Sequence, residues 1–283
     1  MKIRIFLIVL SILMLVSVIS GFARGQKEPY QDKVQIVVSI SPQTYFVEKI
    51  GGDKVIVSIM VPPGANPATY EPRPGQMKEL SHARMYVRIK VPFENAWMDK
   101  ISAANKNMLI VDSTMGIERI GGKDPHIWLS PGLVKIQVEN IYSGLVQVDP
   151  ENKEIYIQNK KTFLKEIGVL DRELAQTFEK VKDRKFMVFH PAWSYLARDY
   201  GLKQIPIEIE GKEPSAAEMA NLIETAKSNN IRVIFVQPQF SSESAETIAR
   251  QIGGKVVFVD PLAGDWANNL RIVAKTLAQA LNE

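Results

Sequence analysis

Apolar residues in the first half of the chain form short runs that alternate with longer amphipathic stretches. The first run, 34–39, is rich in Val and Ile and ends before Pro42, which is typical of a buried strand. Gly51 and Gly52 then close a helix. The same reading predicts strands at 55–61, 85–89 and 108–111, and helices at 44–50, 75–82 and 93–105. This alternation predicts an α/β fold with a mainly parallel sheet.

A single long amphipathic segment follows, from Pro150 to about Lys182. Asp149 and Pro150 form a helix start, as Ser130 and Pro131 do earlier. A helix of roughly 30 residues runs about 45 Å, which suits a backbone that joins two lobes. Gly168 is the only interruption, so two helices that break there are the alternative.

Strands and helices alternate again after residue 183. Strands are expected at 186–189, 204–209, 232–236 and 256–259, and helices at 193–200, 216–229, 242–252 and 266–281. The segments that begin at Lys33 and Lys185 share the order strand, loop, helix and glycine. This indicates a duplicated lobe, although any two βα units share that much. The predicted division is a leader at 1–25, an N-terminal α/β lobe at 26–148, a linking helix at 149–182 and a C-terminal α/β lobe at 183–283.

The leader has the pattern of an export signal. Lys2 and Arg4 precede an apolar run at 5–19, which is short for a membrane-spanning helix. Ala23 and Gly25 are small residues placed for a cut before Gln26. We therefore expect a periplasmic protein, with an uncleaved membrane anchor as the alternative.

Composition excludes several classes of protein. The 35 Lys and Arg residues exceed the 31 acidic ones, but three of the basic residues (Lys2, Arg4 and Arg24) lie in the leader. The remainder is nearly balanced, so we expect no nucleic-acid partner. The chain has no cysteine, which excludes disulfides, thiolate catalysis, Cys-ligated metals and a lipid on an N-terminal Cys. Phosphate-binding loops, the G-x-S-x-G turn and H-E-x-x-H are also absent from the sequence.

Only three histidines occur, and two of them are candidate metal ligands. His190 and Asp260 each follow a predicted strand of the second half, so they are expected at the same sheet edge. His126 lies in a stiff loop of the first half and reaches them only across a cleft between lobes. Two imidazoles and a carboxylate are enough to begin a zinc, manganese or iron site. The alternative for each loop histidine is an ordinary hydrogen-bonding role. His82, within a predicted helix, is expected to be exposed or at a boundary, and not to be a ligand.

The loop at 61–72 contains four prolines and follows a predicted strand. It is either a binding element or simply a rigid surface loop.

Four ordered motifs make the chain resemble the extracytoplasmic solute-binding proteins of ABC importers for zinc and manganese. They are Pro-Gly-x-x-Pro-x-x-Tyr-Glu-Pro at 63–72, Asp-Pro-His-x-Trp-Leu at 124–129, His-Pro-Ala-Trp-x-Tyr at 190–195 and Val-Asp-Pro-Leu at 259–262. The resemblance implies two α/β lobes joined by one long helix, with the metal between the lobes. It also implies that His126, His190 and Asp260 are ligands.

The chain departs from the family at one implied ligand. The family has a histidine in the first loop where this chain has Ala68. We therefore expect a three-ligand site that water or a nearby carboxylate completes. Zinc is the expected metal, with manganese possible.

The expected function is a monomeric periplasmic receptor, not an enzyme, that delivers the metal to the permease of an ABC importer. One alternative is a secreted metal-dependent enzyme with a two-His-one-carboxylate site. Glu208, Glu210 and Glu213 are its candidate bases, because carboxylates cluster there. The other alternative is a relative adapted to another solute or to adhesion.

Overall fold

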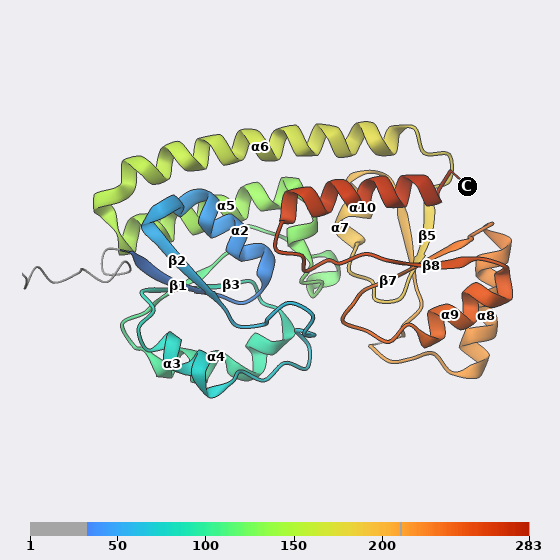
Figure 1. The fold of residues 1–283 in the computed structure, drawn as a ribbon, viewed down its shortest axis with the longest axis horizontal. Helices are drawn as coiled ribbons and strands as arrows, with labels where there is room; N and C mark the ends of the chain where they lie inside the picture. Colours follow the sequence, from blue (N-terminus) through green and yellow to red (C-terminus); the bar gives the residue numbers. More distant parts are fainter. Residues whose placement is uncertain (1–32, 210, 283) are drawn as a thin grey trace, which may run out of the picture. The chain divides into compact units, whose positions relative to one another are not determined.

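The computed structural model describes residues 33–209 and 211–282. From Val34 onward the chain forms one compact unit, shown in Figure 1. The predicted export signal at 1–25, with its cleavage point, and the candidate base Glu210 lie outside the described residues. None of the helices in the described part is long and apolar enough to cross a membrane.

The first half is built on a parallel four-stranded sheet with the order β2-β1-β3-β4. Val, Ile and Met fill its strands, and β1 and β3 are almost wholly buried. The strands are β1 (Val34–Val38), β2 (Val55–Ile59), β3 (Met85–Arg88) and β4 (Leu109–Asp112). The helices between them are α2 (Ser41–Gly51), α3 (Pro74–Leu80) and α4 (Pro92–Ala104).

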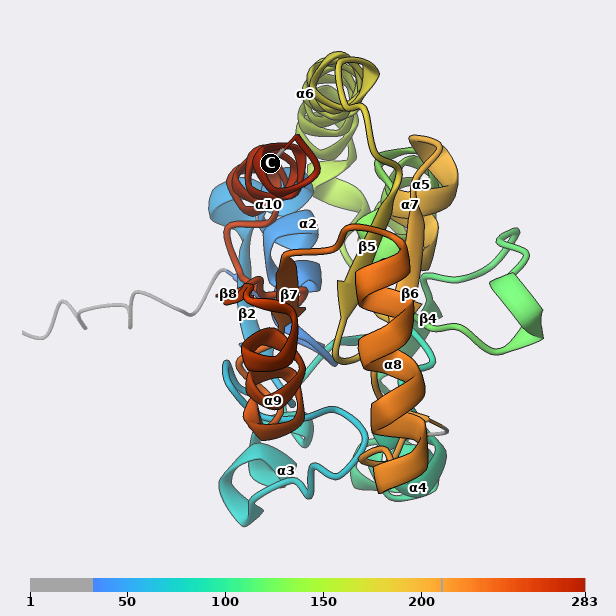
Figure 2. The same cartoon turned by 90° about the vertical axis from the view of Figure 1, so that its right-hand side faces the viewer.

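The second half repeats this topology with the order β6-β5-β7-β8, again all parallel. Thus β5 takes the place that β1 has in the first sheet, which agrees with the similarity of the segments that begin at Lys33 and Lys185. The strands are β5 (Lys185–Val188), β6 (Lys203–Pro206), β7 (Val233–Val236) and β8 (Lys255–Phe258). The helices are α7 (Ser194–Asp199), α8 (Ala216–Ser228) and α9 (Glu243–Ile252), and Figure 2 shows α8 and α9 side by side.

Three further helices connect the two sheets. They are α5 (Pro131–Val148), α6 (Lys153–Glu179) and α10 (Trp266–Ala280). The 27 residues of α6 pass through Gly168 without a break, so the alternative of two helices is wrong. At 1.5 Å per residue α6 is about 40 Å long. It packs on α5 and α2 from the first half and on α10 from the chain's end, as Figure 1 shows.

The main hydrophobic core is continuous across both halves. Phe46 of α2, Phe163 of α6 and Trp266 of α10 meet edge-on or tilted, with ring centroids 5.1–6.4 Å apart. A second core cluster lies between the other face of the second sheet and the helices α8 and α9. The fold expected from the sequence is therefore confirmed as two parallel α/β sheets with one long helix across them.

Two local predictions need correction. His82 is exposed as expected, but it lies in a turn after α3 has ended at Leu80. The strand expected at 204–209 ends at Pro206, whose ring nitrogen has no hydrogen for a ladder bond. The next residue, Ile207, still donates its backbone N–H to the Val188 carbonyl (2.8 Å).

Candidate metal centre

Two histidines from different halves of the chain face each other. His126 stands just before the short 3-10 helix η3 (Ile127–Leu129), and His190 follows β5 by two residues. Their Nε2 atoms are 3.3 Å apart and their ring centroids 5.1 Å apart. The structure thus brings together two of the three side chains that the sequence singled out.

A carboxylate holds the other nitrogen of each ring. Asp124 Oδ1 lies 2.8 Å from Nδ1 of His126, and Glu208 Oε1 lies 2.8 Å from Nδ1 of His190. A carboxylate accepts hydrogen bonds, so each Nδ1 carries the hydrogen. Each Nε2 then presents its lone pair to the other ring, and this arrangement favours a cation between the two nitrogens.

The spacing of the two Nε2 atoms fits a metal ion. Imidazole nitrogens bind zinc at about 2.0–2.1 Å, and two such bonds at a tetrahedral angle place the nitrogens about 3.3–3.4 Å apart. The observed separation of the two Nε2 atoms, 3.3 Å, lies in this range. The pair of rings therefore has the geometry of two ligands of one tetrahedral ion.

Burial and charge keep His126 in the form that binds metals. Burial lowers the pKa of His126, and only part of this effect is offset by the carboxylate of Asp124. Burial works to raise the pKa of Asp124, but the hydrogen bonds and charge of His126 bring it below its ordinary value. A neutral imidazole beside an ionised carboxylate is the state that a metal ion requires.

Backbone contacts fix the position of both histidines. The buried amide of Gln237 accepts from the His190 N–H (3.1 Å) and donates to the His190 carbonyl (2.6 Å). Tyr195 of α7 donates its hydroxyl to the Asp124 carbonyl (2.8 Å) and so holds the loop of His126.

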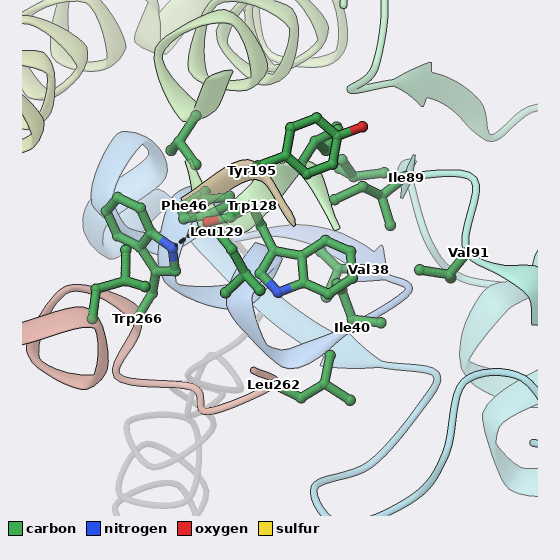
Figure 3. Packing of buried hydrophobic residues seen from close by; sticks show 14 of the residues in the cluster. Val38, Ile40, Phe46, Ile89, Val91, Trp128, Leu129, Tyr195, Leu262 and Trp266 are labelled. Atoms are coloured by element: carbon green, nitrogen blue, oxygen red, sulfur yellow. Dashed lines mark hydrogen bonds between the residues drawn. The ribbon is translucent and has the colours of Figure 1, made fainter. Parts of the chain in front are cut away.

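Two tryptophans tie the same loop to the second half. Trp128 Nε1 donates to the Pro261 carbonyl and Trp266 Nε1 donates to the Trp128 carbonyl, both at 2.7 Å. Figure 3 shows Trp266 directed toward Trp128, with Leu262 close by. The loop of His126 is thus attached to the C-terminal half by buried donors.

Asp260 is not brought to the histidine pair. Its Oδ1 accepts from Gln239 Nε2 and from the Leu262 N–H, both at 2.9 Å. In the part of the chain that the structure describes, no three His, Asp or Glu side chains are close enough to hold a metal ion. Asp260 nevertheless follows β8 at the sheet edge where His190 follows β5, and its neighbours Pro261 and Leu262 line the same cavity as the histidines.

A cavity of about 250 Å³ opens beside the two rings. The proline-rich loop forms one wall, and Ala68 within that loop is exposed and offers no side-chain donor. Phe240 forms another wall and stacks on His190, with ring centroids 4.6 Å apart. The remaining lining includes Asn66, Pro67, Thr69, Val91, Pro92, Pro125, Trp128, Glu208, Gln239, Pro261 and Leu262.

The role of Glu208 beside His190 was not predicted from the sequence. The cluster of carboxylates at 208–213 indicated only a candidate base. The strand order provides a signal, since β6 neighbours β5 and a residue just past β6 reaches one just past β5. The roles of Gln237 and Tyr195 depend on contacts between segments 47 and 71 residues apart, which no local pattern shows.

The chain is similar in sequence and structure to known zinc-uptake proteins. Residues 36–280 match the family model described as "Zinc-uptake complex component A periplasmic". The chain is 30% identical to the "High-affinity zinc uptake system protein ZnuA" of Bacillus subtilis (strain 168), over 92% of this chain and 88% of that protein. A solved structure described as "Crystal structure of ZnuA" is 50% identical, covers 88% of this chain and 100% of that chain, and gives a TM-score of 0.87. A zinc-bound ZnuA deletion mutant is also 50% identical, with a TM-score of 0.85 and coverage of 89% and 99%.

Proposed function

Because the chain belongs to the family of periplasmic zinc-uptake component A proteins, we propose that it captures a divalent transition metal and delivers it to the permease of an ABC importer. Zinc is the first candidate and manganese the second. The observation that carries this proposal is the pair of Nε2 atoms 3.3 Å apart, each on a ring that a carboxylate orients from behind. The receptor performs no reaction on its cargo.

The proposed ligands are His126, His190 and Asp260. Only Oδ1 of Asp260 receives hydrogen bonds from the described residues, so Oδ2 is available to a cation. A metal ion between the imidazoles attracts this carboxylate, and the free Oδ2 can bind it while Oδ1 keeps its two hydrogen bonds to neutral donors. Water completes a tetrahedral site with three protein ligands.

The proposal extends to the organisation and location of the chain. The leader at 1–25 exports it, the lobes at 26–148 and 183–283 hold the metal between them, and the segment at 149–182 links them. The exported protein acts as a monomer in the periplasm. The family description supports the periplasmic location, and the paired imidazoles from the two halves support a metal held between them.

Isothermal titration of metal-free protein with zinc, and separately with manganese, tests the proposal. We expect one metal per chain, and a loss of affinity of at least about tenfold, or 1.4 kcal/mol, for His126→Ala, His190→Ala and Asp260→Ala separately. His82→Ala is the matched control, because His82 is exposed and lines no part of the cavity. Retained binding in the His126 and His190 variants, or a loss in the control, would reject the site.

A further inference from the structure

The cavity beside the histidine pair is much larger than a metal ion with one water needs. Its volume is about 250 Å³, whereas a water molecule occupies roughly 30 Å³ of liquid. Ala68 lines this space and provides no side-chain donor to the metal. The open coordination position therefore faces a space of small-molecule size.

One wall of the cavity has a polar atom without a partner. Gln239 Nε2 donates to Asp260, which fixes the orientation of the amide, and Gln239 Oε1 is buried with no hydrogen bond to any described residue. A buried acceptor of this kind costs about 1–3 kcal/mol unless a donor reaches it. A ligand with an N–H group supplies such a donor.

A basic hollow adjoins the cavity, since Pro92 and Pro125 line both. Its cationic side chains are Arg88, Lys90, Arg119 and Lys123. Arg88 pairs with Glu94, and Lys90 pairs with Asp112. Arg119 donates only to the carbonyls of Lys90 and Lys123, and neither Arg119 nor Lys123 has a carboxylate within 4.0 Å among the described residues.

The two adjoining hollows thus carry charges of opposite sign. The cavity beside the rings presents imidazole nitrogens backed by carboxylates, which attract a cation. The neighbouring hollow presents Arg119 and Lys123, which attract a carboxylate. A bare metal ion matches the first hollow only, whereas a metal complex with an anionic organic group that extends past the shared prolines matches both.

We propose that the cavity takes the metal as a complex with a small chelating amino acid of the L-histidine type. This inference rests on the proposed function. The amino acid supplies the metal donor that the wall at Ala68 lacks, and an N–H group donates to Gln239 Oε1. Its own imidazole and amine bind the metal in place of the water and make the ion five-coordinate, so its carboxylate is free to face Arg119 and Lys123.

Equilibrium dialysis of the metal-free full chain with carbon-14-labelled L-histidine, with and without zinc, tests this inference. We expect one L-histidine retained per bound zinc, and none without zinc. The double variant Arg119→Gln with Lys123→Gln should lower L-histidine retention at least about fivefold, and zinc alone should bind as in the wild type. Lys106→Gln with Lys180→Gln removes two exposed cations that line neither hollow, and should retain L-histidine fully.

The outcomes separate the two proposals. Zinc binding with no retained L-histidine overturns the inference and leaves the proposed function intact. L-histidine retained equally without zinc also overturns it, because the site then recognises the amino acid alone. Unchanged retention in the Arg119 and Lys123 double variant, with its fold verified by circular dichroism, overturns the assigned carboxylate contacts. Absence of zinc binding under both conditions rejects the proposed function itself.

Discussion

Replacing Glu208 by glutamine tests how the site prepares His190 for a metal. The carboxylate lies 2.8 Å from Nδ1 of His190, and its side chain is only 7% exposed. Glu208→Gln keeps the size of the side chain and removes its charge. An amide oxygen still accepts from Nδ1, but it polarises the ring less and binds the hydrogen more weakly.

The expected loss follows from the role of this contact. Mutation of the partner behind a metal-binding histidine typically lowers metal affinity 10–100-fold, which is about 1.4–2.8 kcal/mol. Competition titration calorimetry with zinc and a chelator of known affinity measures this range. Glu224→Gln is the matched control, because this carboxylate is 76% exposed on α8 and pairs only with Lys227 at 3.4 Å. If Glu208→Gln binds zinc as tightly as the wild type while His190→Ala does not bind it, the orienting role of Glu208 is wrong.

Three further predictions concern the loop, the tryptophans and a buried acid. Ala68→His should tighten zinc binding at least about tenfold, or roughly 1.4 kcal/mol, in the same titration; no gain in a folded variant would show that this loop does not approach the metal. Trp266→Phe leaves a void and removes the donor to the Trp128 carbonyl, so we expect urea unfolding to show a loss of about 2–4 kcal/mol; a loss below about 0.5 kcal/mol, the usual range of surface changes, would contradict this. Burial raises the pKa of Glu94, so the folded protein binds a proton there at higher pH than the unfolded chain does. The free energy of unfolding therefore gains from this group as the pH falls from the raised pKa toward the unfolded value of about 4.3. In urea unfolding, the free energy of unfolding of the wild type should therefore rise relative to that of Glu94→Gln as the pH is lowered through this window. A difference between the two proteins that does not change with pH would be evidence against the raised pKa.

Much of the fold could be predicted because its signals are local. Runs of β-branched residues located each strand to within a few residues, and the capping serines are visible in the sequence. The Ser130 hydroxyl accepts from the Leu133 N–H, and Ser215 forms a capping box with Glu218. The facing of His126 and His190 was implied by the family resemblance. The positions of the strand ends predicted instead that His190 would meet Asp260, and the structure does not bring those two side chains together.

The rest of the site could not be predicted because it depends on contacts that no spacing encodes. Asp260 stands at the expected strand end, yet its side chain bonds to Gln239, 21 residues away. The expected strand at 204–209 placed Glu208 within the sheet, whereas Pro206 ends β6 and leaves Glu208 to turn toward His190. The directions of the Asp260 and Glu208 side chains depend on which hydrogen bonds form in the packed protein.

The attachment of the His126 loop to the C-terminal half bears on how the metal leaves. Tyr195, Trp128 and Trp266 connect this loop to the second half through three hydrogen bonds of 2.7–2.8 Å. We therefore expect His126, which belongs to the first half in sequence, to move with the second half. A change of angle between the two sheets would then leave the imidazole pair together and separate it from the proline-rich loop. On that basis we expect ligand exchange on the side of Ala68 to govern the dissociation rate of the metal.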